Sequence, residues 1–284
     1  MALLLLALSI LAAAATNLLL HALPLQTKEN LFLYNLFCSG VWLALLASLC
    51  AGDLAFTRNE LFFGGLCGLL QTAFLLCKSG AMSTGPVSVT TLVGNCSLLL
   101  STIAGVLLWQ EQVGIGQGIG IALLCVAVFL CTFRSGSSTT HRKSWPFFCV
   151  GFLLTAAGVG LLFKAFQKAG GGDSSRMLFC CAAVMLPCMF ACALFTHAFT
   201  KSTLPVRRRL LPILLSGILS CLYNRLNISL AGALPSVLFY PIFNGGIILL
   251  CALCGRVLFR EKNSPSGLLG LLLGLAAIVI IGIS

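Results

Sequence analysis

Charged residues are scarce in this sequence, and their scarcity excludes most soluble folds. Only 8% of the 284 residues are Asp, Glu, Lys or Arg, whereas 59% are hydrophobic. A soluble domain is typically about 25% charged. Because no soluble core could bury this much apolar surface, we expect lipid to be the solvent, and we predict an all-α integral membrane protein.

Acidic residues are the fewest of the charged ones, and none lies in the middle of an apolar stretch. The sequence also lacks an HExxH motif, a GxSxG motif, a Walker phosphate loop and an embedded pair of carboxylates. A membrane enzyme would need a positioned acid, base, nucleophile or metal cluster. We therefore expect neither an enzyme nor an autonomous ATP-driven pump, and we predict no metal or cofactor site.

The fifteen cysteines lie almost entirely within apolar stretches. Redox and metal-binding thiols need polar, accessible surroundings, so we interpret these cysteines as small apolar side chains. Their odd number also argues against a complete disulfide framework.

About ten apolar stretches of roughly 20 residues follow one another along the chain, each long enough to cross a bilayer as a helix. The predicted spans are 2–22, 31–51, 61–80, 86–109, 113–133, 146–167, 177–199, 210–230, 235–258 and 265–283. A cleaved signal peptide is not favoured for the first span, because no positively charged residues precede it.

The two halves of the chain share landmarks at nearly constant spacing. Pro86 and Pro235 lie 149 positions apart, and so do Asn95 and Asn244. Nearer the start, AAATNLLLHAL aligns with AAGVGLLFKAF at a spacing of 143 positions. This order of matches indicates a duplication of about 142 residues.

Five helices in each half is an odd number, so the second half must enter the membrane in the opposite sense. We therefore predict ten transmembrane helices as two inverted five-helix repeats, residues 1–137 and 138–284. Inverted repeats are common in secondary transporters, whose solute site lies near the midplane between the repeats. Nine residues of helix rise about 13.5 Å, which places Asn95 and Asn244 near mid-bilayer from opposite faces.

The stretch LPSVLFYPIFNGG (Leu234–Gly246) combines apolar residues with helix-disturbing ones. Pro241 is expected to kink its helix and to free a carbonyl near Asn244. Such a polar, bent segment is costly against lipid, so it should face a cavity or a partner helix. An asparagine that only bonds a neighbouring helix is the alternative interpretation.

Polar side chains at membrane depth are the default functional candidates. We predict that a solute binds at Asn17, His21, Gln71, Asn95, Tyr223, Asn224, Tyr240 and Asn244. Asn95, Asn244 and the polar face of the 210–230 helix should line one central cavity. Lys164, which aligns with His21, either joins the solute path or extends to the membrane interface.

The ends of the two halves, LLWQEQ (Leu107–Gln112) and LFREKNSPSGLLGLLLG (Leu258–Gly274), resemble a known pattern. They are similar to the duplicated hallmark of the EamA-like branch of the drug/metabolite transporter superfamily. There, each five-helix half ends in a long helix, a tight turn bearing Glu, and a Gly-rich helix. The resemblance implies ten helices and transport of small organic solutes, often export.

Small multidrug relatives in that superfamily use a glutamate embedded in the first helix to exchange protons for cationic drugs. This sequence has no such residue. A path with His, Lys and Arg but no acid favours neutral, zwitterionic or anionic solutes. Coupling to protons through His21 and uncoupled facilitated diffusion both stay open.

Glu111 and Glu261 occupy tight turns, where an acid suits the positive N-terminus of the helix that follows. We interpret both as structural. The patterns Gly116-xxx-Gly120 and Gly270-xxx-Gly274 place small residues four apart, which lets helices approach closely. We therefore expect the fifth and tenth helices to pair.

The net charge of +11 comes from basic residues that collect in loops, so we expect membrane orientation by positive loops and no nucleic-acid partner. If both termini lie outside, the inner loops hold ten basic residues and the outer loops hold three, so the charge count favours both termini outside. The family resemblance instead favours both termini in the cytoplasm. The expected setting is a plasma membrane, bacterial inner membrane by type, with lipid as neighbour and a monomer or homodimer as the assembly.

The leading hypothesis is therefore a secondary transporter, an exporter of small organic metabolites or drugs, working by alternating access. A lipid-carrier flippase or a non-transporting membrane scaffold of the same fold is the alternative.

Overall fold

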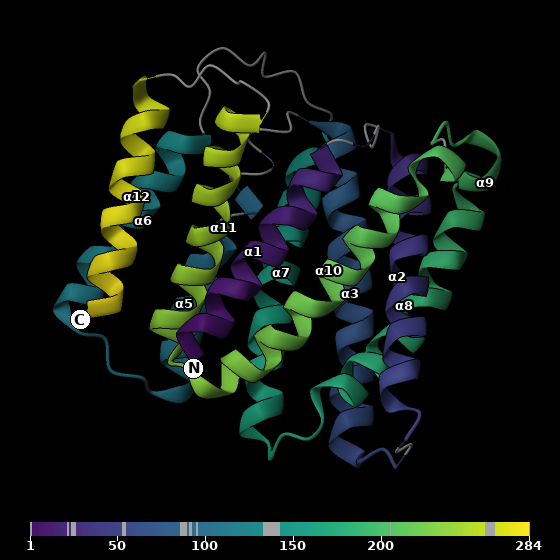
Figure 1. Ribbon diagram of the computed structural model, residues 1–284, viewed down its shortest axis with the longest axis horizontal. Coiled ribbons are helices and arrows are strands. Elements are labelled where there is room, and N and C mark those ends of the chain that lie inside the picture. Colours follow the sequence, from purple (N-terminus) through teal and green to yellow (C-terminus); the bar gives the residue numbers. More distant parts are fainter. Residues whose placement is uncertain are drawn as a thin grey trace.

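The computed structural model describes residues 2–21, 23, 27–52, 55–85, 90, 93–94, 96–132, 143–204, 206–258 and 265–283. Within those ranges every long regular element is a helix (Figure 1). The helices are α1 (Ala2–His21), α2 (Lys28–Cys50), α3 (Arg58–Thr84), α5 (Ser97–Trp109), α6 (Ile115–Thr132), α7 (Trp145–Lys168), α8 (Ser174–Phe195), α9 (Ala198–Lys201), α10 (Val206–Ala233), α11 (Ser236–Leu258) and α12 (Pro265–Ile283).

Seven of these helices are long and apolar enough to span a membrane, namely α1, α2, α3, α7, α8, α10 and α11. The described parts of α5, α6 and α12 are shorter apolar helices. Large apolar side chains face outward, including Leu4 at 77% exposure and Phe147 at 77%. Soluble monomers rarely expose contiguous apolar surface on this scale. The chain is thus an all-α, multi-pass membrane protein.

Helix boundaries differ from the predicted spans where the backbone turns. The 177–199 stretch is not one helix, because α8 ends at Phe195 and His197 adopts a left-handed φ of 53° before α9 begins. Helix α10 extends beyond the predicted 210–230 and contains a kink at Arg209. Pro212 lies three positions further on, where its missing N–H and its ring disturb the preceding turn of backbone.

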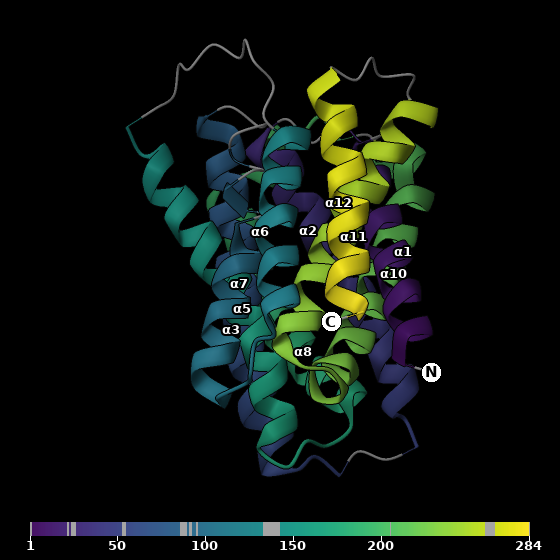
Figure 2. The same cartoon turned by 90° about the vertical axis from the view of Figure 1, so that its left-hand side faces the viewer.

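The helices run side by side, and both chain termini lie at the same end of the molecule (Figures 1 and 2). We call this end the terminal face. It also carries the turns α2–α3, α5–α6, α7–α8 and α10–α11, which lie at the lower edge of Figure 1.

Two groups of helices form the centre of the fold. Helix α7 packs against α3 and α5, and we name these three the α7 group. Helix α1 packs against α10 and α11, and we name these the α1 group. The groups meet where α5 contacts α11 and α10 contacts α7, and the pairs α2–α8 and α6–α12 lie beside them.

The expected pairing of the fifth and last helices is confirmed, because α6 packs along α12. Gly120 makes this approach possible: a Cβ atom there would lie 2.6 Å from Ile281 Cγ1 and 3.2 Å from the Ala277 carbonyl oxygen. Gly274 differs, since it faces Leu249 of α11 rather than α6.

Replacing Gly120 with valine should therefore lower the free energy of unfolding by about 1–3 kcal/mol, because the added side chain forces α6 away from α12. Gly118 is the matched control on the same helix, since a Cβ atom there would meet no described neighbour within 4 Å. Thermal unfolding of the purified variants in detergent measures both. Equal shifts for Gly118→Val and Gly120→Val would contradict the packing role.

Candidate functional site

The predicted solute-binding residues are distributed over both central groups. Gln71 is buried on α3, in the α7 group, whereas Asn17 is exposed on α1. The others that the structure describes belong to the α1 group: Tyr223 and Asn224 on α10, and Tyr240 and Asn244 on α11. Asn95 and the side chain of His21 lie outside the described residues.

Tyr223 and Tyr240, two of the predicted residues, make different contacts. Aromatic rings join α10 to α11 at Tyr223. The Tyr223 ring lies 6.3 Å from that of Phe243, and Phe239 stacks on Phe243 at 5.8 Å. Tyr240 extends in another direction, since its hydroxyl donates to the Gly160 carbonyl oxygen at 2.9 Å. Gly160 belongs to α7, so Tyr240 connects the two central groups.

The asparagines of α10 and α11 play different roles. Asn227 accepts a hydrogen bond from Ser9 Oγ of α1 at 2.7 Å, as expected of an asparagine that joins neighbouring helices. Asn224 and Asn244 instead donate to carbonyl oxygens of their own helices, Ser220 at 2.8 Å and Tyr240 at 3.1 Å. Within the described part of the chain, neither amide bonds another helix.

Sequence reasoning left the role of Lys164 open, and the structure places it in the interior. The residue is 2% exposed, so its ammonium group is enclosed by the protein and does not face lipid or solvent. Lys164 Nζ forms an ion pair with Glu111, donates to Ser236 Oγ at 2.7 Å and lies 5.3 Å from the centre of the Trp109 ring. We call these four residues the Glu111 network.

Glu111 stabilises a different helix from the one expected. Its Oε2 accepts a hydrogen bond from the backbone N–H of Ser236 at 2.6 Å, at the start of α11 rather than α6. The first N–H groups of a helix lack intrahelical partners, and the helix dipole favours an anion there. Gly105 leaves room for this contact, because a Cβ on it would lie 2.4 Å from Ser236 Cβ.

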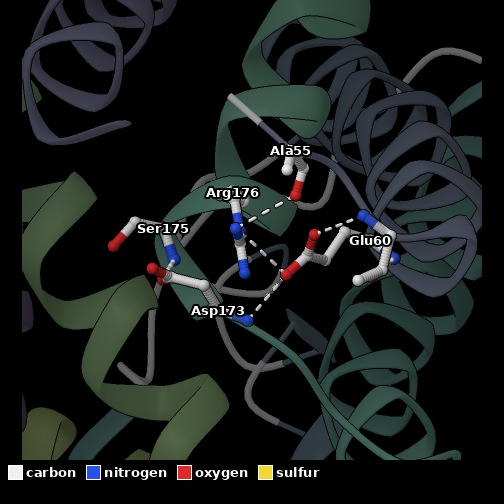
Figure 3. A network of polar contacts seen from close by, with 6 residues as sticks. Ala55, Glu60, Asp173, Ser175 and Arg176 are labelled. Atoms are coloured by element: carbon white, nitrogen blue, oxygen red, sulfur yellow. Dashed lines mark hydrogen bonds and ion pairs between the residues drawn. The ribbon is translucent and has the colours of Figure 1, made fainter. Parts of the chain in front are cut away.

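A second polar network joins the α2–α3 turn to the α7–α8 turn on the same face (Figure 3). Glu60 Oε1 accepts from the Asp173 N–H at 2.8 Å and from Arg176 Nε at 3.1 Å, and Oε2 accepts from the Thr57 N–H at 2.8 Å. Arg176 Nη1 also donates to the Ala55 carbonyl oxygen at 3.0 Å. The Glu60 side chain is 0% exposed, so these bonds satisfy a fully buried carboxylate.

A third, uncharged network lies at the opposite end of the helices. Asn30 of α2 accepts from Ser202 Oγ at 2.8 Å and from the Thr203 N–H at 3.0 Å, and its amide donates to Thr203 Oγ1 at 3.2 Å. It fixes the segment before α10 to the start of α2.

Comparison with known proteins finds distant relatives, and nucleotide sugar transporters are among them. No family model matches the sequence. A protein of uncharacterized function from Haemophilus influenzae is 24% identical over 234 residues, which cover 79% of this chain and 76% of that protein. The nucleotide sugar transporters SLC35B4 of Pongo abelii and Homo sapiens are 31% and 30% identical over 140 residues. The latter matches span 42% of this chain and 42% of those transporters.

The fold itself is shared with a solved structure. A crystal structure whose description names no function superposes with a TM-score of 0.76 at 15% identity. The superposition covers 99% of this chain and 96% of the other. The helical architecture is thus an experimentally known one.

Proposed function

We propose that this chain is a secondary transporter that moves small organic solutes across a membrane by alternating access. The distant homology to nucleotide sugar transporters supports a solute transporter in general. The observation that carries the mechanism is that each central group combines helices from both halves of the sequence. Helix α7 of the second half packs against α3 and α5 of the first, and α1 of the first half packs against α10 and α11 of the second. The result is two similar groups that can rock against one another.

The helix packing supports two inverted five-helix repeats at 1–137 and 138–284, with ten transmembrane helices. If α1 corresponds to α7, then α10 and α11 correspond to α3 and α5, and the α1 group corresponds to the α7 group. A two-fold axis would bring those equivalent helices that lie near it into contact with each other. The contacts α2–α8, α5–α11 and α6–α12 are of that kind.

Two of the polar networks fit the same symmetry. Asn30 joins the start of α2 to the segment before α10, and the Glu60 network joins the start of α8 to the start of α3. Because α2 corresponds to α8 and α10 corresponds to α3, the elements joined by one network are the equivalents of those joined by the other. The two networks sit at opposite ends of the helices, as inverted repeats require.

We propose that the solute passes between the α1 and α7 groups. Asn224 and Asn244 are the strongest candidates for solute contact, because their amides bond only their own helices among the described residues. Tyr223 and Gln71 extend the polar path. The absence of mid-span acids favours neutral, zwitterionic or anionic solutes, and the EamA-like resemblance favours export across a plasma membrane.

The decisive test is uptake and efflux of a pooled metabolite and drug panel in proteoliposomes, with and without a pH gradient. We expect at least one solute to move, and removing both amides in Asn224→Ala/Asn244→Ala should slow it by roughly tenfold, since each lost hydrogen bond weakens solute binding. Asn59→Ala is the control, because Asn59 is on the terminal face and bonds the Ala169 carbonyl oxygen.

Unchanged transport by a folded Asn224→Ala/Asn244→Ala variant would refute the placement of the path. If no panel member moves through well-folded wild-type protein, the lipid-carrier flippase or scaffold interpretation replaces the transporter.

A further inference from the structure

The Glu111 network lies where the two central groups meet on the terminal face. Glu111 follows α5 and Lys164 lies on α7, so both charges belong to the α7 group. Ser236 is the first residue of α11 and belongs to the α1 group. The bonds from Ser236 to both charged residues therefore cross from one group to the other.

We propose that the Glu111 network is a latch that closes the terminal face by holding the start of α11 against the α7 group. This inference rests on the proposed alternating access. One turn further along α11, Tyr240 reinforces the closure through its hydrogen bond to Gly160 of α7. Opening of the terminal face then requires Ser236 and Tyr240 to leave α7 and the α5–α6 turn together.

The arrangement of the charges makes this latch reversible. When α11 departs, Lys164 and Glu111 stay paired on the same group, so neither charge is left alone in the membrane. The bonds that break join a helix N-terminus to a carboxylate and a hydroxyl to an ammonium group. Water entering the opened face can replace those partners.

The Glu60 network behaves differently, although it too contains an ion pair between a carboxylate and a basic side chain on the same face. It connects the starts of α3 and α8, two helices that pack against each other. Separating them would strand a carboxylate that is 0% exposed. We therefore infer that Glu60 is a permanent brace, and it serves as the internal control for the latch.

A distance measurement across the terminal face tests the latch. Fluorophores attached through keto amino acids at positions 112 and 233 report the separation of the two groups, because Gln112 and Ala233 are both exposed, one on each group. Introducing keto groups leaves the native cysteines in place. Single-molecule energy transfer in nanodiscs then gives the ratio of long to short distances.

We expect Glu111→Gln to raise that ratio roughly tenfold, since a charge-assisted hydrogen bond becomes a neutral one and Lys164 loses its partner. Ser236→Ala, which removes only the hydroxyl, should raise it by about threefold and guards against misfolding of the first variant. Glu60→Gln should leave the ratio unchanged. A wild-type ratio in both latch variants, or an equal rise in Glu60→Gln, would overturn the proposal.

Transport assays on the same samples separate this proposal from the proposed function. If the latch variants shift the ratio of long to short distances but the protein moves no solute, the latch is supported and the transporter is refuted. Wild-type transport with unchanged distances in Glu111→Gln refutes the latch and keeps the transporter.

Discussion

Replacing Glu60 with alanine is expected to lower the free energy of unfolding by about 3–5 kcal/mol, the range for breaking a buried ion pair. The carboxylate is 0% exposed and accepts hydrogen bonds from Thr57, Asp173 and Arg176. Removing it leaves two backbone N–H groups and a guanidinium without their acceptor at once. Two turns that are distant in sequence are then released together.

Thermal unfolding in detergent, followed by a dye that reacts with exposed thiols, measures this effect, and we expect the midpoint to fall by roughly 10 °C. Glu29→Ala is the matched control, because Glu29 also lies in the first turn of a helix but is only partly buried. A fall of similar size in both variants would show that the Glu60 network does not stabilise the fold.

The second large effect is expected for Lys164→Met, which should also cost about 3–5 kcal/mol, because the Glu111 carboxylate loses its ammonium partner at the protein interior. The side chains of Lys164 and Glu111 are 3% and 16% exposed, so water compensates only part of that loss. Lys168→Met, four positions along the same helix, is exposed and should be nearly neutral.

The double variant Lys164→Met/Glu111→Gln distinguishes a lost partner from lost packing. An uncharged pair leaves no buried charge alone, so we expect the double variant to recover about 1–3 kcal/mol relative to the sum of the single variants. Additive single effects would mean that the two charges do not act on each other, contrary to their contact in the structure.

The sequence predicted the helices far better than the partners of the charged residues. Apolar length places α1, α2 and α11 within a few residues, since the bilayer dictates it. The spacing Thr57-x-x-Glu60 is a local capping box that can be read without a structure. The bond from Arg176 to Glu60 spans 116 positions, and no local pattern reveals it.

In the candidate site, too, individual residues could be predicted from the sequence but their partners could not. Repeat alignment singled out Lys164 and the tight turn singled out Glu111, but neither pattern could pair them, because pairing depends on how α5, α7 and α11 pack. Glu111 was assigned to the helix that follows it, and in fact it binds the N-terminus of a helix 125 positions away. The prediction of one cavity lined by Asn95 and Asn244 stays a prediction.

The packing of α1 against α10 and α11 has a consequence for synthesis of the protein. Helix α1 is made before α10, so the Ser9 hydroxyl cannot bond Asn227 until the chain has grown by a further 218 positions. At roughly 5–20 residues per second, the ribosome needs about 10–45 s to reach it. During that interval, α1 sits in the bilayer without the two helices against which it packs. We therefore expect the final packing of α1 to form only after α10 and α11 have entered the bilayer.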